Sequence, residues 1–363
     1  MVQIFVDDDF QHYVSKDLIY RIVLSSPFHQ LVFDSVSIYC VDSKVLDNIC
    51  PPERVKGIPR GNLRDVKDKL EECLDRIEEA SKESKPIEEI SEIVDRCIDD
   101  ISESERVIVA KACYVNLGGD ICVFLREKFG IDASAGPGIF VAVNRALHNA
   151  ELISSQIGHH KYRAIFLNVF RSLLIHETFH AFTDLNGLKY CDEVWFRFFE
   201  ESLAEYTAYL HLSNFGRIVF GIESREKPIE YKAWVVWRKL LSTFDTFMCA
   251  CISWLKNWPI QFLNIITSPH PILGLGKHGN IKRKTQKDRH IFDISISPFI
   301  LLQKDDLTSL SAIWYIAGSI IKGLNVRALG GIIENIKNGK IGGEYLWKYL
   351  FLCLLKYTSI LTK

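Results

Sequence analysis

The stretch RSLLIHETFHAFTD, residues 171–184, decides the fold. Its centre is HETFH at 176–180, and two histidines four positions apart lie on one face of an α-helix, about one turn apart. Both imidazoles can therefore reach a single metal ion. Glu177 is rotated by about 100° around the helix from the first histidine, so it can reach a water molecule beside that ion. Apolar residues flank the motif on both sides, which predicts a long, buried helix over residues 162–184.

The two imidazoles leave a zinc site incomplete, because a catalytic zinc ion usually has three protein ligands and one water. A second predicted helix, over about 194–212, carries EESLAEY at 200–206. Asn186-Gly187 supplies a turn that lets the two helices pack antiparallel, so that Glu201 could become the third ligand. Glu205, one turn further along the same face, could accept the remaining N–H of either histidine and orient its ring.

HETFHAFTD followed by EESLAEY, within residues 172–206, resembles the gluzincin metallopeptidases, and most closely the thermolysin-like enzymes. The resemblance implies one zinc ion per chain, held by three ligands: His176, His180 and Glu201. It implies that Glu177 is the catalytic base and that Glu205 replaces the Asp that orients a ligand ring in the family. Asp184 matches the family's Asp four residues after the second histidine. The implied activity is zinc-dependent hydrolysis of peptide bonds in a peptide or protein substrate.

Other interpretations of the motif stay open at this point. A His/Glu cluster with no catalytic role, zinc-stabilised or metal-free, would make the chain a catalytically inactive zincin-like interaction module. A latent protease whose N-terminal part occludes the cleft is a further possibility. A di-iron carboxylate site needs two Glu-x-x-His elements, and the chain has only the one from Glu177 to His180. The residue that would stabilise the oxyanion is not assigned; the candidates beyond the second helix are Tyr231, His270, His278 and His290.

The composition excludes several classes of protein. With 48% hydrophobic and 25% charged residues among 363, the chain is globular rather than disordered. Lys and Arg total 44 against 45 Asp and Glu, so the net charge of −1 gives no reason to expect nucleic acid as a partner. No apolar run is both long and uninterrupted enough to predict a membrane span. The N-terminus does not resemble a signal peptide and the ten cysteines form no Cys-x-x-Cys pair, which predicts a cytoplasmic protein with mostly reduced, buried thiols.

We therefore expect an α+β, zincin-like fold in two parts. Residues 1–185 would form a mixed α/β part with a small sheet, the HETFH helix and an acidic helical hairpin over 61–103, which Lys85-Pro86 interrupts. Residues 186–363 would form a mostly helical part that carries Glu201. The active-site cleft would lie between the two parts, with the HETFH helix as its floor. The oligomeric state is not predicted.

Three stretches rich in β-branched and aromatic residues are expected to be strands: 2–6, 35–41 and 139–143. Prolines and glycines predict a loop over 51–61 and a turn at Gly136–Gly138. The resemblance to zincins suggests that the strand at 139–143 is an edge strand that pairs with extended substrate, with Asn144 as a polar contact. The alternative is an interior strand with no role in substrate binding.

Overall fold

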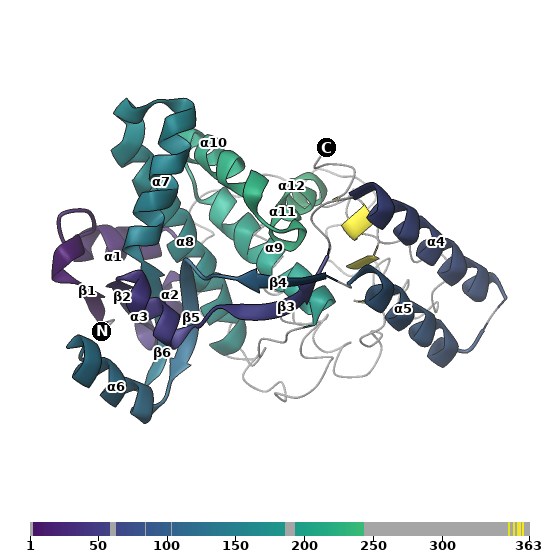
Figure 1. Ribbon diagram of the computed structural model, residues 1–363, viewed down its shortest axis with the longest axis horizontal. Helices are drawn as coiled ribbons and strands as arrows, with labels where there is room; N and C mark the ends of the chain where they lie inside the picture. The colour runs from purple at the N-terminus through teal and green to yellow at the C-terminus, as the bar shows by residue number, and fades with distance from the viewer. Residues whose placement is uncertain are drawn as a thin grey trace, which may run out of the picture. The chain divides into compact units, whose positions relative to one another are not determined.

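The computed structural model describes residues 3–58, 63–83, 85–102, 104–185 and 193–242, together with residues 348, 351, 352, 354–356 and 358. These residues are mostly helical with a small sheet, which confirms the α+β class (Figure 1). No helix in this part of the chain is both long and apolar enough to cross a bilayer. The turn expected at 186–187 and most of the helical part expected beyond residue 242 lie outside the described residues.

The chain divides into two compact units, each made of segments that are discontinuous in sequence. The first unit comprises Met1–Val55, Glu105–Leu185 and Ala204–Lys227. The second comprises Lys56–Ser104, Asn186–Leu203 and Pro228–Lys363. Because the helix that carries Glu201 and Glu205 contributes residues to both units, the division does not follow the order of elements along the chain.

The first unit is built on a four-stranded sheet. Its strands, in spatial order, are β1 (Ile4–Val6), β2 (Ser37–Val41), β6 (Gly136–Ala142) and β5 (Ala112–Leu117). The first three run parallel, whereas β5 is antiparallel to β6. Because β2 and β6 are almost continuously apolar and buried, they have the character of strands covered on both faces.

Helices cover both faces of this sheet. On one face, α3 (Ser43–Ile49) and α6 (Gly119–Phe129) share a core cluster with Tyr39 and Phe140, whose rings stack with centroids 4.5 Å apart. Neighbouring side chains of a strand point to opposite faces, so Tyr114, which pairs with the residue before Phe140, lies on the other face. There it hydrogen-bonds to the long helix α8 (Tyr162–Leu185), which packs against β5 and β6.

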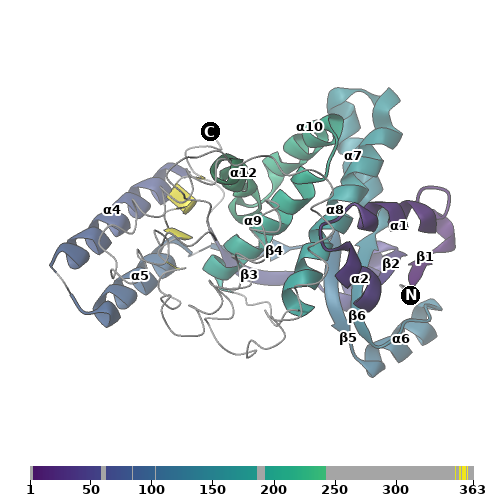
Figure 2. The ribbon, with the colours of Figure 1, turned by 180° about the vertical axis from the view of Figure 1, so that it is seen from behind.

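α8 is the helix predicted from HETFH, and it is the centre of the first unit. Four further helices pack against it: α1 (Lys16–Leu24), α2 (His29–Ser35), α7 (Val143–Ile157) and α10 (Asn214–Glu223) (Figure 2). Three short 3-10 turns complete the unit: η1 (Asp8–Phe10), η2 (His159–Lys161) and η3 (Ser224–Glu226). Because neighbours surround α8, nearly every residue from 172 to 183 is buried, including the polar ones.

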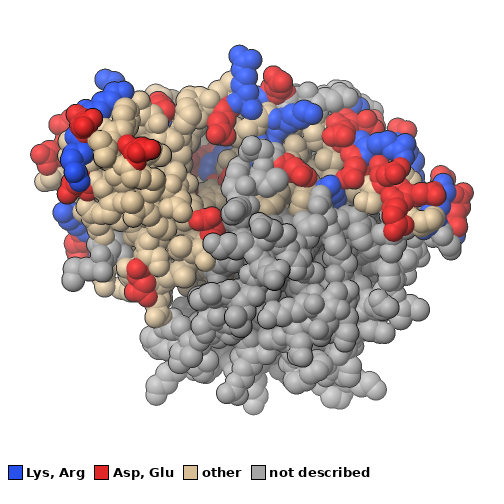
Figure 3. Space-filling view, turned by 90° about the horizontal axis from the view of Figure 1, so that it is seen from below, with Lys and Arg blue, Asp and Glu red and all other residues tan. Residues whose placement is uncertain are grey.

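The remaining elements include the hairpin expected from sequence. α4 (Leu63–Lys82) and α5 (Ile87–Ile101) pack side by side, and the chain breaks between them at Pro86, as predicted (Figure 1). Figure 3 shows acidic side chains, with some basic ones among them, gathered over this hairpin. Exposed acidic residues of its two helices include Glu72, Glu78, Glu79, Glu88 and Glu89. The other elements are α9 (Val194–Leu210), α11 (Ile229–Lys232), α12 (Trp234–Ser242) and a ribbon of β3 (Glu53–Gly57) and β4 (Ser104–Ile108).

Two local expectations are wrong, and the structure decides between the two alternatives for a third segment. The segment 51–61, expected to be a loop, contains the strand β3. Pairing with β4 outweighs the tendency of the glycines and prolines in this segment to form a loop. Gly136–Gly138 is not a turn but the start of β6, where Gly136 adopts a φ of 126° within an extended segment. The strand expected at 139–143 is an interior strand, since β6 lies between β2 and β5.

Asn144 was expected to be a polar contact for substrate, but its side chain makes hydrogen bonds within the fold. Its Oδ1 accepts from Ser43 N at 2.9 Å and its Nδ2 donates to Asp42 Oδ2 at 2.7 Å. Asp42 is the N-cap of α3, and its side chain accepts from Lys44 N. Asn144 therefore fixes the start of α3 rather than facing a substrate.

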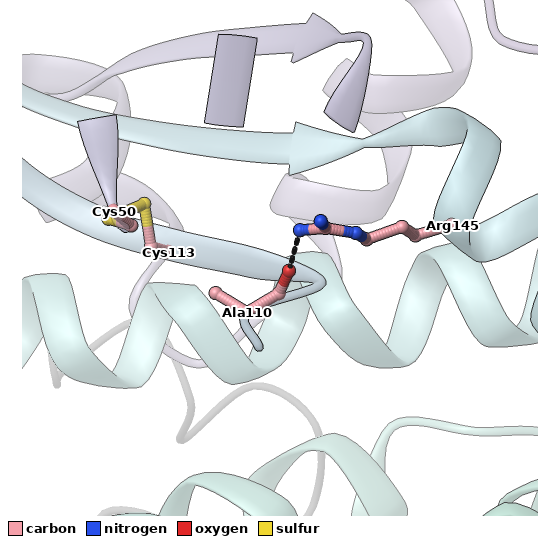
Figure 4. The surroundings of a disulfide bond; sticks show 4 residues. All are labelled: Cys50, Ala110, Cys113 and Arg145. Atoms are coloured by element: carbon pink, nitrogen blue, oxygen red, sulfur yellow. Dashed lines mark hydrogen bonds between the residues drawn. A yellow bond between two sulfur atoms is a disulfide. The ribbon is translucent and has the colours of Figure 1, made fainter. Parts of the chain in front are cut away.

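The thiols are only partly as expected. Cys50, at the end of α3, and Cys113, on β5, form a disulfide (Figure 4). Nearby, the Arg145 guanidinium donates a hydrogen bond to the carbonyl of Ala110. The other cysteines whose side chains the structure describes are free and buried: Cys40, Cys73, Cys97 and Cys122. The disulfide ties edge strand β5 to the segment that follows α3.

Two glycine-to-alanine substitutions test the contribution of backbone conformation to the stability of α6 and α10. Gly130 ends α6 with φ 67°, and a Cβ there would meet nothing within 4 Å, so Gly130→Ala should lower the free energy of unfolding by about 1 kcal/mol through backbone strain alone. Gly221 lies inside α10, where a Cβ would also meet nothing within 4 Å and φ is not positive. Gly221→Ala should therefore raise the free energy of unfolding by about 0.5–1 kcal/mol. Urea denaturation followed by circular dichroism measures both. Shifts of the same sign in the two variants would contradict this account.

Candidate metal centre

α8 brings the two predicted histidines to one point. The Nε2 atoms of His176 and His180 lie 2.9 Å apart, and their ring centroids are separated by 4.8 Å. His176 is buried and His180 is partly buried. The spacing of four residues produces this arrangement directly, because both rings project from the same face of one helix.

Glu201 joins the histidines from α9. One ligand atom from each of His176, His180 and Glu201 lies within 4.8 Å of the others. Glu201 is 7% exposed, so its carboxylate is withdrawn from solvent together with His176. Imidazole nitrogens and a carboxylate oxygen are ligand atoms that zinc and related metal ions accept. The three side chains could therefore hold a metal ion.

Glu205 lies one turn beyond Glu201 on α9 and is 3% exposed. Its Oε1 lies 3.1 Å from Nδ1 of His176. An imidazole whose Nδ1 carries the proton toward a carboxylate has the lone pair of Nε2 available for a metal ion. The structure thus places Glu205 against His176, one of the two histidine rings that Glu205 was expected to orient.

The charge state of Glu205 depends on opposing effects. Burial raises the pKa of this carboxyl, but the charge of Lys227 and the contact with His176 outweigh burial and hold the pKa below its usual range. Lys227 Nζ donates to Oε1 at 2.8 Å and to Oε2 at 2.9 Å. Glu205 is therefore ionised at neutral pH, as an acceptor for an imidazole N–H must be.

The other predicted residues are found in several places. Glu177 is 5% exposed on α8, next to His176, and Glu200 is 2% exposed on α9. Asp184, one turn after His180, accepts a hydrogen bond from the Tyr114 hydroxyl at 2.7 Å. Of the candidates for stabilising an oxyanion, Tyr231 lies on α11 and is partly buried. The three histidine candidates, at 270, 278 and 290, lie outside the described residues.

Sequence reasoning missed two contributors to this region. Lys227 follows η3 and lies beyond all the motifs, so no spacing rule connects it with Glu205. Tyr114 lies on β5, a strand that the sequence did not predict. Neither residue carries a local signal, because each is brought to its partner only by tertiary packing.

Comparison with known proteins finds no matching family model, no matching curated protein and no matching solved structure. The resemblance to gluzincins therefore rests on residues 172–206 alone.

The Tyr114–Asp184 contact predicts a dependence of stability on pH. Burial first, and then the hydrogen bond to Asp184, raise the pKa of Tyr114. An unfolded tyrosine ionises near pH ~10, whereas the folded one keeps its proton, so the free energy of unfolding should fall as the pH rises through that value. In Tyr114→Phe this fall should be shallower, as urea midpoints between neutral and alkaline pH would measure.

Tyr20 supplies the control for this measurement. It is 48% exposed, so Tyr20→Phe makes the same substitution without removing a buried hydroxyl. Identical slopes in the wild type and Tyr114→Phe would show that Tyr114 is not the group responsible.

Proposed function

We propose that this protein is a zinc-dependent metallopeptidase of gluzincin type, with zinc held by His176, His180 and Glu201. The observation that carries the proposal is the convergence of two imidazole nitrogens and a carboxylate within 4.8 Å of one another. Two imidazoles and one carboxylate are the protein ligands of one common kind of catalytic zinc site. The zincin-like arrangement, with a cleft above α8, is part of this proposal.

The measured separations fit a zinc ion. Nitrogens bound to one tetrahedral zinc at about 2.0–2.1 Å lie about 3.3 Å apart. The Nε2 atoms of the two histidines are 2.9 Å apart, so a few tenths of an ångström of side-chain movement would admit the ion. An oxygen-rich octahedral site for magnesium or calcium would not use two imidazoles.

The roles of the side chains follow from their places on the two helices. When bound, zinc supplies Lewis acidity that polarises a scissile carbonyl and makes a water acidic near neutral pH. Glu177, adjacent to His176, takes the proton of the attacking water and later delivers it to the leaving amine. The water oxygen thereby joins the carbonyl carbon as the C–N bond breaks, and no covalent enzyme intermediate is needed.

Edge strand β5 supports a peptide as the substrate. Among the described residues, β5 pairs only with β6, so its outer edge has backbone groups that an extended peptide could use. Tyr114 joins β5 to α8 at Asp184, one turn after His180. We therefore transfer to β5 the substrate-pairing role first expected for the strand at 139–143.

Metal analysis tests the ligand set. Purified wild type should carry one zinc ion per chain, and Glu201→Gln should weaken zinc binding by more than about a hundredfold, above the loss typical of groups that only orient a ligand. Glu200→Gln is the matched control, because Glu200 is equally buried but rotated by about 100° around the helix. Chelator competition gives both affinities. Zinc-free wild type, or equal losses in the two variants, would contradict the proposed ligands.

Glu177→Gln tests the reaction separately from the metal. The variant should bind zinc as the wild type does, but hydrolysis of a peptide library should fall by about 10²–10⁴-fold because no group takes the proton from the water. Mass spectrometry of the digests measures the loss. Zinc binding without cleavage that depends on Glu177 would favour the alternative of a zincin-like interaction module.

A further inference from the structure

A chain of buried polar contacts continues behind the candidate metal centre, on the side of His176 away from His180. Glu205 contacts Nδ1 of His176, and Lys227 Nζ donates to both oxygens of Glu205, at 2.8 and 2.9 Å. Oε1 of Glu205 is shared between the ammonium and the imidazole. Lys227 thus contacts Glu205, and Glu205 in turn contacts the proposed metal ligand His176.

Lys227 is itself held in place. Its Nζ lies 5.3 Å from the centroid of the Phe220 ring and 3.9 Å from Oε1 of Glu223, at the end of α10. That Oε1 accepts from Lys111 Nζ at 3.0 Å and from Asn149 Nδ2 at 2.7 Å. Side chains from α7, α10 and the segment before β5 therefore fix the ammonium, and the ammonium fixes the carboxylate.

We propose that Lys227 is a positioning residue for the metal centre, which holds the Glu205 carboxylate against Nδ1 of His176 so that Nε2 of this ring points at the ion. Glu205 has three rotatable side-chain bonds and a single contact to the ring, which alone would not fix its orientation. Two contacts from one ammonium restrict these rotations. The inference rests on the proposed metal centre at His176, His180 and Glu201.

Removing Lys227 has two opposite effects on metal affinity. Loss of a positive charge from this region would by itself strengthen binding of a divalent cation. Loss of the orientation of His176 would weaken it, and groups that orient a metal ligand typically contribute 10–100-fold in affinity. The direction of the change therefore distinguishes positioning from a simple charge effect.

The experiment compares variants of the full chain. Lys227→Met should weaken zinc binding about tenfold in chelator competition, at the lower end of the range for such groups. With cobalt(II) in place of zinc, its visible absorption spectrum should differ from that of the wild type. Lys227→Arg retains the charge and the donors, so it should restore both properties. Lys161→Met is the control, because it removes the same charge from an exposed lysine that lies over the Phe215 ring and takes no part in the contacts described above, and it should resemble the wild type.

The outcomes separate this inference from the proposed function. Wild type that binds no zinc or cobalt would refute the metal centre itself. Wild type that binds metal, with Lys227→Met binding equally or more tightly and with an unchanged cobalt spectrum, would overturn the role of Lys227 alone. If Lys227→Met does not fold, Lys227→Gln, which keeps an N–H donor without the charge, takes its place with the same criteria.

Discussion

The contact between the two Nε2 atoms is the constraint on which the rest of the site depends. At 2.9 Å, two imidazole nitrogens cannot both present bare lone pairs, so they must share either a proton or a cation. A shared proton would satisfy the two rings alone. Glu201 brings a carboxylate oxygen within 4.8 Å of one ligand atom from each ring, a third ligand atom that a metal ion could use and that a shared proton does not require.

The packing around α8 makes this contact possible. A helix that carries charged and polar groups at 176, 177, 180 and 184 would face solvent if its sequence followed ordinary amphipathic patterning. α8 is instead covered by four helices and two strands, and apolar side chains fill the positions between the polar ones. This packing restrains α8. The orientation of the two rings therefore depends on the packing of the surrounding unit as well as on their spacing along the helix.

The sequence predicts what depends on periodicity and misses what depends on pairing. The helical spacing of residues 162–184 and the motif within it locate α8, and Lys85-Pro86 locates the break between α4 and α5, because these signals are local. β3 and the interior position of β6 are set by hydrogen bonds to distant strands, which neither glycine content nor apolar character reveals. For the same reason the sequence indicated Glu201 and Glu205 by helix spacing, while Lys227 needed the structure.

Under the proposed likeness to gluzincins, Glu205 occupies the position where those enzymes have an aspartate, and the difference has a physical consequence. Glutamate is one methylene longer than the aspartate of the family, so its carboxylate gains reach and loses rotational restriction. A carboxylate that must hold one ring in one orientation therefore needs a second restraint. Lys227 supplies that restraint from the segment after α10, with both oxygens of Glu205 engaged by one ammonium. Glu205 and Lys227 thus act as a pair, since the longer side chain has a rotational freedom that the contact with Lys227 removes.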